Sequence, residues 1–153
     1  MEIIRFTKQD EKYKCFSNFY HCKVTYDGMT YLSSEAAWQA QKTEDERERL
    51  KFTTIGPSVA KRMGRSVSLR WDWEDVKDAL MVSILLQKFG NNAELKEILI
   101  STGDAEIIED TTGWHDNIWG DCRCSRCISR PGQNRLGKAL MRVRTLLTQD
   151  LPY

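Results

Sequence analysis

The order of apolar and polar residues predicts short strands near the start of the chain. Residues 2–6, EIIRF, form a short, mostly apolar run typical of a strand. Residues 22–34 alternate between apolar and polar positions and contain Asp27-Gly28, a dipeptide typical of a tight turn between two antiparallel strands. The first part of the chain therefore predicts one strand followed by a β-hairpin.

Helical signals follow the hairpin. Ser34 predicts the cap of a helix of about 8–14 residues, and Glu35 suits the positive end of its dipole. Residues 44–52, EDERERLKF, are highly charged and predict an exposed helix or turn. Residues 57–65 predict a short helix that begins at a proline.

The second half of the chain alternates between helical and extended patterns. Residues 73–92 give the clearest helix, which we expect to end near Gly90. Its expected apolar stripe consists of Val76, Leu80, Ile84 and Phe89. The remaining predictions are a helix over 93–102, a buried strand over 105–110, an aperiodic segment over 111–133 and an amphipathic helix over 134–149.

This succession predicts an α+β fold, because helices outnumber strands and no β-α-β rhythm is present. The chain has 153 residues, of which 41% are hydrophobic and 29% are charged, values typical of a globular protein. No internal repeat and no Pro/Gly-rich linker divides it. We therefore expect one compact, helix-rich domain over residues 1–153.

The net charge and the cysteine content limit which ligands the protein is expected to bind and in which cellular compartment it is expected to act. The net charge is +1, so no overall positive field attracts nucleic acid, and anionic ligands must be held by local cations. The longest apolar runs are too short to span a bilayer, and the first residues lack the apolar stretch of a signal peptide. Five cysteines, an odd number, favour free thiols in a reducing compartment. These observations predict a cytoplasmic protein without a membrane segment.

A first cluster of candidate functional residues lies in residues 31–42, YLSSEAAWQAQK. On a helix, Glu35, Gln39 and Lys42 share one face, and Trp38 lies beside them. A carboxylate, an amide and an amine along one face can form a catalytic site. The same spacing also occurs on a solvated helix face, so both interpretations stay open at this point.

A second cluster contains two tryptophans that flank Asp72. Arg70, Trp71 and Trp73 complete it. An indole can cover a heterocycle or a sugar face, a contact that contributes on the order of 1–3 kcal/mol per base. Tryptophans so close to a helix start can also be core anchors.

A third cluster lies in the aperiodic residues 111–127, where Asp116 and Trp119 could present a carboxylate and a ring to a ligand. Cys122, Cys124 and Cys127 have a spacing close to that of metal ligands, but they provide three of the four that a structural zinc site needs. Free thiols are the favoured interpretation, with no bound metal and no cofactor. Candidates for a fourth ligand are His115, Cys15 and Cys22.

Several function classes are excluded by missing motifs. The chain has no phosphate-binding loop, no dinucleotide fingerprint and no serine-hydrolase nucleophile elbow. A cysteine nucleophile is disfavoured because the only histidines available as a base are His21 and His115.

Taken together and in order, these clusters resemble the NADAR family, also called YbiA-like. The resemblance spans roughly residues 3–147 and rests on six segments. In chain order they are CFSNFY (15–20), SSEAAWQAQK (33–42), AKRMGRSVSLRWDWEDVKDALM (60–81), LLQKF (85–89), DNIWG (116–120) and GQNRLGKALMRVR (132–144). The stretch GWHDNIWGDCRCSRC departs from the family by a cysteine insert, and Thr111 to Trp114 stand where many members carry a Ser-Pro step.

The resemblance implies a compact α+β fold and an N-glycosidase that cleaves a bond between ribose C1 and nitrogen. Implied substrates are ribosylamine pyrimidine intermediates of early riboflavin synthesis or ADP-ribose attached to guanine in nucleic acid. The motif match places Glu35, Lys42, Trp73, Asp116 and Trp119 at the pocket. We add Trp38, Gln39 and Asn18 as expected substrate-binding residues.

The residue types suggest how such a bond is broken. Positive charge develops on the sugar and negative charge on the departing nitrogen, so a carboxylate and a proton donor both help. Glu35 and Asp116 supply carboxyl groups, and a neutral Lys42 could form a Schiff base with an opened sugar. For a substrate 5′-phosphate the candidates are Arg62, Arg65 and Arg70, which could equally be surface residues.

Two other functions are compatible with the sequence. One is a non-catalytic module that binds ADP-ribose or a nucleotide through the same tryptophans. The other is a zinc-stabilised interaction domain. The low net charge favours a small-molecule ribosylamine phosphate over modified nucleic acid, and the oligomeric state is not predicted.

Overall fold

The computed structural model describes residues 2–149 and confirms the helix-rich α+β pattern. Its strands are β1 (Ile3–Phe6), β2 (Val24–Tyr26), β3 (Met29–Tyr31) and β4 (Glu106–Glu109). Its helices are α1 (Ser34–Ala40), α2 (Glu46–Leu50), α3 (Pro57–Met63), α4 (Trp73–Gly90), α5 (Ala93–Ser101) and α6 (Arg135–Thr148), with a short 3-10 turn, η1, at Lys14–Phe16. None of the helices in this part of the chain is long and apolar enough to cross a membrane.

The chain forms two compact units. The first unit combines residues 1–17 with residues 93–153, and the second consists of residues 18–92. The expectation of a single domain over residues 1–153 stays a prediction.

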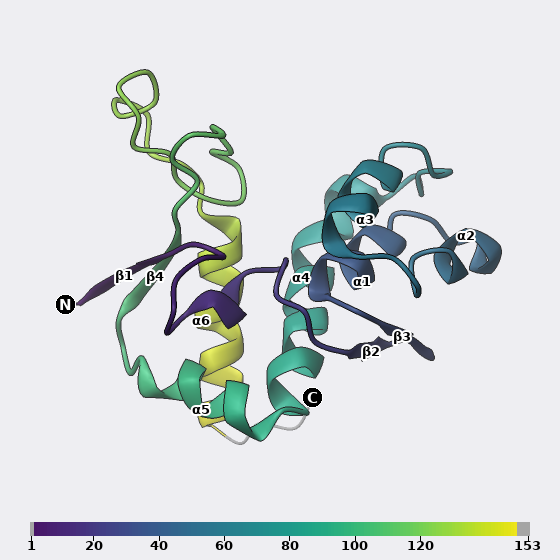
Figure 1. The fold of residues 1–153 in the computed structure, drawn as a ribbon, viewed down its shortest axis with the longest axis horizontal. Coiled ribbons are helices and arrows are strands. Elements are labelled where there is room, and N and C mark those ends of the chain that lie inside the picture. Colours follow the sequence, from purple (N-terminus) through teal and green to yellow (C-terminus); the bar gives the residue numbers. More distant parts are fainter. Residues whose placement is uncertain (1, 150–153) are drawn as a thin grey trace. The chain divides into compact units, whose positions relative to one another are not determined.

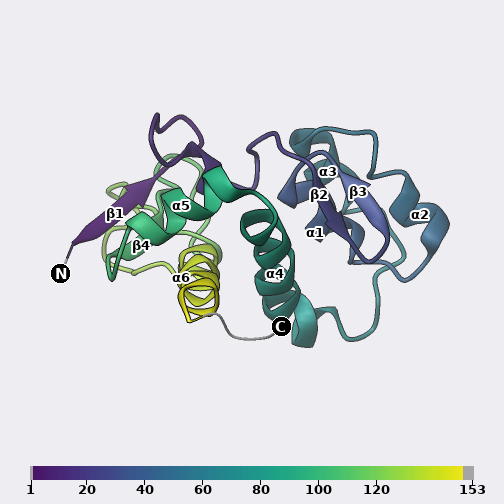
Figure 2. The same cartoon turned by 90° about the horizontal axis from the view of Figure 1, so that it is seen from below.

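In the first unit, β1 and β4 pair in parallel although about a hundred residues separate them along the chain. Ile3 lies opposite Glu106, and Phe6 lies opposite Glu109. Helix α6 packs on β4, and α5 packs on α6 (Figures 1 and 2). The fully buried core side chains of this unit include Phe6, Phe16, Leu99, Ile107, Leu136 and Leu140. The predicted buried strand at 105–110 is thereby confirmed.

Helix α6 approaches β4 so closely that Gly137 has no room for a side chain. A Cβ added to Gly137 would lie 2.0 Å from the backbone oxygen of Ile107. We expect Gly137→Ala to lower the free energy of unfolding by about 1–3 kcal/mol, because the contact with a backbone atom outweighs the better helix propensity of alanine. Urea denaturation measures this. Arg142→Ala, at an exposed position of the same helix, is the control. A Gly137→Ala variant more stable than the parent would contradict this prediction.

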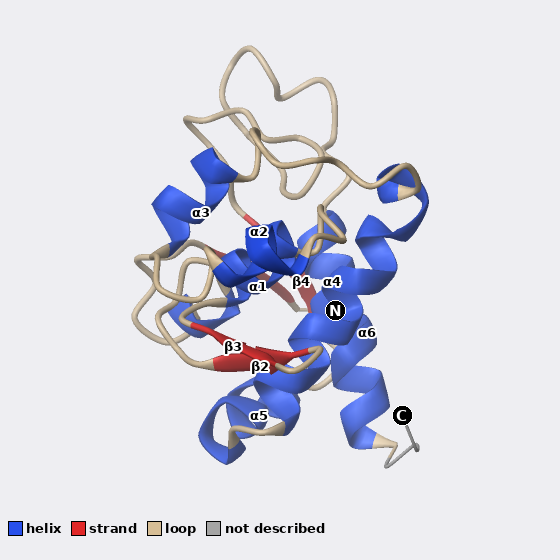
Figure 3. Ribbon diagram, turned by 90° about the vertical axis from the view of Figure 1, so that its right-hand side faces the viewer, coloured by secondary structure: helices blue, strands red, loops and turns tan. Residues whose placement is uncertain are grey.

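In the second unit, β2 and β3 form the predicted antiparallel hairpin (Figure 3). Asp27 and Gly28 have φ values of 49° and 83°, so the turn uses the left-handed region that this dipeptide tolerates. Helix α1 packs against α3 and α4, and α4 also contacts β2. The fully buried side chains here include Tyr31, Phe52, Met81, Ile84, Leu85 and Phe89.

Two predictions about helix details are wrong. The cap of α1 is Ser33, whose hydroxyl accepts the backbone N–H of Ala36 at 3.1 Å, and the helix has 7 residues instead of about 8–14. Adjacent serines offer two possible caps, and the chain uses the first. The buried stripe of α4 includes Trp73, Met81, Ile84, Leu85, Lys88 and Phe89, whereas the predicted Val76 and Leu80 are only half-buried.

Candidate functional site

Glu35 lies in the first turn of α1 and is buried, with 7% of its surface exposed. Its backbone N–H donates to the carbonyl oxygen of Asn18 at 3.1 Å, which fixes the start of the helix. Burying a carboxylate is costly unless hydrogen bonds or charges compensate. A solvated helix face does not bury a carboxylate, so this alternative is wrong for Glu35.

Gln39 holds the Glu35 carboxylate in place. Its Nε2 donates to Glu35 Oε1 at 2.9 Å, as the i, i+4 spacing predicts. Gln39 Oε1 is buried without a hydrogen-bond partner, and it faces Gly64 so closely that a Cβ there would lie 2.0 Å away. An unpaired buried amide oxygen costs about 1–3 kcal/mol, so this amide orientation serves Glu35 at the expense of stability.

Lys42 lies just past the end of α1 and is half-buried. Its Nζ lies 5.6 Å from the ring centroid of Trp38 and 5.8 Å from that of Trp73. Burial lowers the pKa of Lys42, the charge of Glu35 opposes this, and the cations Arg65 and Lys77 lower it further. Glu35, Gln39 and Lys42 thus lie in one neighbourhood, although Lys42 is outside the helix proper.

Trp38 and Trp73 pack against each other with ring centroids 4.9 Å apart. They are 7% and 5% exposed, and Trp38 Nε1 donates to the carbonyl oxygen of Lys77 at 3.0 Å. This burial favours core anchoring, the alternative left open by the sequence. Their contact with a substrate stays a prediction. Trp71, by contrast, is 90% exposed.

The arginines predicted to bind phosphate differ in their surroundings. Arg70 forms a two-pronged pair with Asp72, with Nε to Oδ1 at 2.6 Å and Nη2 to Oδ2 at 3.1 Å. This hydrogen bonding raises the pKa of Arg70 and lowers that of Asp72. Arg62 and Arg65 are exposed on the segment that includes α3. Arg70 therefore has a partner in its own turn, and Arg65 is the more available cation near Lys42.

The sequence pattern did not predict that a buried lysine contacts α1. Lys88 of α4 is 2% exposed, and its Nζ donates to Ser34 Oγ at 3.2 Å. Ser34 Oγ in turn donates to Asn18 Oδ1 at 2.8 Å. Lys88 falls seven residues after buried Met81, so its place on the apolar stripe was the available signal. In the structure, Asn18 positions the first turn of α1.

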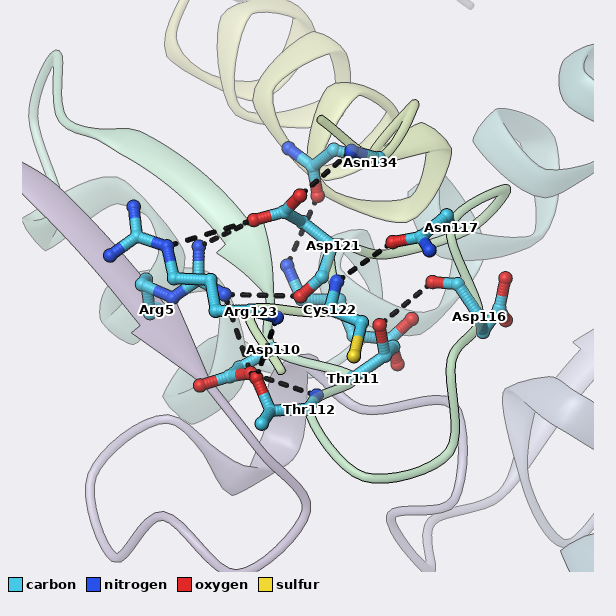
Figure 4. Close-up of polar contacts among 12 residues, drawn as sticks. Arg5, Asp110, Thr111, Thr112, Asp116, Asn117, Asp121, Cys122, Arg123 and Asn134 are labelled. Atoms are coloured by element: carbon cyan, nitrogen blue, oxygen red, sulfur yellow. Dashed lines mark hydrogen bonds and ion pairs between the residues drawn. The ribbon is translucent and has the colours of Figure 1, made fainter. Parts of the chain in front are cut away.

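In the first unit, Asp121 anchors the long segment between β4 and α6 (Figure 4). Its Oδ1 accepts the N–H of Gly132 at 2.7 Å, and its Oδ2 lies 2.9 Å from Arg5 Nη1. The Gly132 N–H and the Arg5 charge hold the pKa of Asp121 below its ordinary value. Asn134, at φ 51°, donates from Nδ2 to the carbonyl oxygen of Ile107 at 2.8 Å. The aperiodic segment is therefore ordered by polar contacts.

Asp116 and Trp119 lie in this segment. Asp116 Oδ1 accepts the N–H groups of Ile118 and Trp119 at 3.0 and 2.9 Å, so the carboxylate shapes the turn that carries the indole. Both residues are half-buried. They belong to the first unit and Glu35 to the second, so their shared role at one pocket stays a prediction.

The same segment brings a histidine and three cysteines together. None of the five cysteines, all within the described residues, forms a disulfide. The sulfurs of Cys122, Cys124 and Cys127 lie 3.6, 3.4 and 3.4 Å from His115 Nδ1. Backbone N–H groups of Cys124 and Gly113, together with His115, lower the pKa of the Cys122 thiol to about 6.

Comparison with known proteins adds a family and a fold. Residues 5–148 match the NADAR domain model. The chain is 40% identical over 148 residues to N-glycosidase YbiA of Escherichia coli, covering 95% of this chain and 88% of that protein. It is 35% identical over 153 residues to a riboflavin biosynthesis protein of Vibrio vulnificus, covering 98% of this chain and 40% of that protein. The NMR structure of Escherichia coli YbiA matches with a TM-score of 0.80 at 36% identity, covering 98% and 88% of the two chains.

Proposed function

This chain belongs to the NADAR domain family, and we propose that it is an N-glycosidase that hydrolyses the bond between ribose C1 and an amine nitrogen. The relatives named N-glycosidase support the reaction class. The observation that carries the proposal is the pairing of a buried carboxylate, Glu35, with a half-buried amine, Lys42, whose pKa is lowered. A buried carboxylate and an amine with a lowered pKa favour acid–base and nucleophilic catalysis.

In the proposed reaction, the neutral amine of Lys42 attacks C1 of the ring-opened ribosylamine. Both protons of the Lys42 amine pass to the original nitrogen, the bond from C1 to that nitrogen breaks so that it leaves as the free amine, and a Schiff base joins Lys42 to the sugar. Water then adds to C1, the bond to Lys42 breaks, and the sugar aldehyde and the amine of Lys42 are released. Glu35 transfers the protons and stabilises positive charge at C1.

For the substrate we favour a ribosylamino-pyrimidine phosphate of the kind formed early in riboflavin synthesis. Two relatives are named riboflavin biosynthesis proteins. A net charge of +1 suits a small anionic metabolite better than a nucleic-acid strand. Arg65 is an exposed cation whose charge acts on Lys42, and we assign it to the substrate phosphate. We further propose that the protein acts in the cytoplasm.

Incubating the purified protein with a ribosylamino-pyrimidine 5-phosphate tests the proposal. We expect release of ribose 5-phosphate and the free aminopyrimidine. Liquid chromatography with mass spectrometry detects both products. A parallel reaction with an ADP-ribosylated guanine strand distinguishes the second substrate class, because ADP-ribose would be released there instead. Tight binding of either substrate without cleavage would overturn the proposal in favour of a non-catalytic binding module.

A further inference from the structure

Four potential metal ligands converge in the segment between β4 and α6. They are His115, Cys122, Cys124 and Cys127, and their ligand atoms all lie within 4.8 Å of one another. The sequence by itself favours free thiols, because three cysteines fall one ligand short of a closed site. The fold supplies His115 as the fourth.

Hydrogen bonding does not explain this convergence. A single ring nitrogen, His115 Nδ1, faces three sulfurs at 3.4–3.6 Å. A neutral imidazole nitrogen carries either one N–H or one lone pair, so it can satisfy one thiol at a time. A shared ion at the centre satisfies all four groups together.

The distances fit a tetrahedral zinc ion. With Zn–S bonds of about 2.3 Å and Zn–N bonds of about 2.0–2.1 Å, a tetrahedral angle places nitrogen and sulfur about 3.6 Å apart and two sulfurs about 3.8 Å apart. The observed nitrogen–sulfur distances of 3.4–3.6 Å agree with this arrangement. Three thiolates and one imidazole form a ligand set that binds zinc in preference to magnesium or calcium.

The backbone is shaped to present these ligands. His115 adopts φ 59°, an uncommon conformation for a residue with a side chain, and its N–H donates to the carbonyl oxygen of Thr111 at 3.2 Å. Cys124 accepts the N–H of Cys127 at 3.0 Å, which closes a tight turn between two ligands. The N–H of Cys122 donates to Asn117 Oδ1 at 2.9 Å, which holds the backbone of this ligand in place.

A bound metal would add to the polar contacts that order this part of the chain. This part runs from β4 to α6 without a helix or a strand, and three of its larger apolar side chains, Trp114, Ile118 and Ile128, are 51%, 48% and 59% exposed. A segment that buries so little apolar surface gains order from a metal or from disulfides. We propose that His115, Cys122, Cys124 and Cys127 bind one structural Zn²⁺, which closes the segment that carries Asp116 and Trp119.

Metal analysis of the full-length protein, purified under reducing conditions and loaded with Zn²⁺, tests the site independently of any glycosidase activity. We expect about one Zn²⁺ per chain after desalting and a strong thiolate-to-metal absorption band when Co²⁺ replaces it. The double variant Cys124→Ser/Cys127→Ser is expected to lose the metal. Cys22→Ser, at a half-buried cysteine of the other unit, is the matched control and is expected to keep it.

Chelation provides a second measurement if the double variant fails to fold. Removing Zn²⁺ from the parent protein is expected to lower Tm by roughly 5 °C or more, and adding Zn²⁺ back is expected to restore it. Absence of bound Zn²⁺ and of the Co²⁺ band in the reduced parent protein would overturn the proposal. Full retention of Zn²⁺ by a folded double variant would overturn this choice of ligands.

Discussion

Glu35→Gln is expected to lower kcat by about 10²- to 10⁴-fold while the protein stays folded. Glutamine has the shape of glutamate and can still accept the bond from Gln39 Nε2, so the first turn of α1 keeps its packing. What is lost is the charge at a buried position and the capacity to transfer a proton. Steady-state kinetics with the ribosylamino-pyrimidine phosphate measures the effect, and circular dichroism checks the fold.

Glu46→Gln is a suitable control for Glu35→Gln, because Glu46 is an exposed carboxylate on α2 of the same unit. We expect its kcat to stay close to that of the parent protein. A Glu35→Gln protein with a kcat within about threefold of the parent would remove the carboxylate from the mechanism, since general acid–base catalysis contributes far more than this.

Local signals in the sequence were sufficient for most elements of the fold. Asp27-Gly28 specifies the hairpin turn, Pro57 begins α3, and the helical periodicity of apolar residues locates α4 and α6. Each of these signals acts within a few residues. The choice between Ser33 and Ser34 as the cap of α1 depends on which residues must be buried, so propensity alone could not make it.

The pairing of β1 with β4 could not be predicted in the same way. Ile3 and Glu106 lie opposite each other in a unit where α6 packs on β4 and α5 packs on α6, and nothing near either residue in the sequence encodes the partner. The conformation of the segment after β4 also depends on contacts between residues that are distant in the sequence. Arg5 and Asp121, which are 116 residues apart in the sequence, hold this segment together.

At the candidate site, helical spacing predicted one side-chain contact but not the surroundings of the candidate residues. The i, i+4 spacing of Glu35 and Gln39 predicted their contact, which the structure has. The burial of Trp73 and the pairing of Arg70 with Asp72 depend on packing and on side-chain conformations, and a residue pattern specifies neither. The role of Lys88 was hidden for a related reason, because lysine is rarely a fully buried residue.

The amine of Lys42 is expected to be trapped covalently during turnover. Adding borohydride while substrate is present should reduce the Schiff base to a stable secondary amine, and peptide mass spectrometry should locate the sugar adduct on Lys42. Lys42→Arg should give no adduct and lower kcat by about 10²-fold or more, because a guanidinium stays protonated and cannot attack C1. The exposed Lys61→Arg is the control. An adduct on another lysine, or an active Lys42→Arg protein, would contradict this role.

The dependence of kcat on pH provides a further test of Lys42. Only the neutral amine attacks, so kcat should rise with pH through the pKa of Lys42, at a lower pH than for an exposed lysine because burial lowers that pKa. Lys77→Gln removes a cation that lowers the pKa of Lys42, so the rise in kcat should move to higher pH. Glu35→Gln removes an anion that raises this pKa, so the rise in any residual kcat should move to lower pH. The bond from Trp38 Nε1 goes to the backbone of Lys77 and survives the first change. Opposite shifts in these two variants would be difficult to obtain unless both charges act on the titrating group, as they do on Lys42.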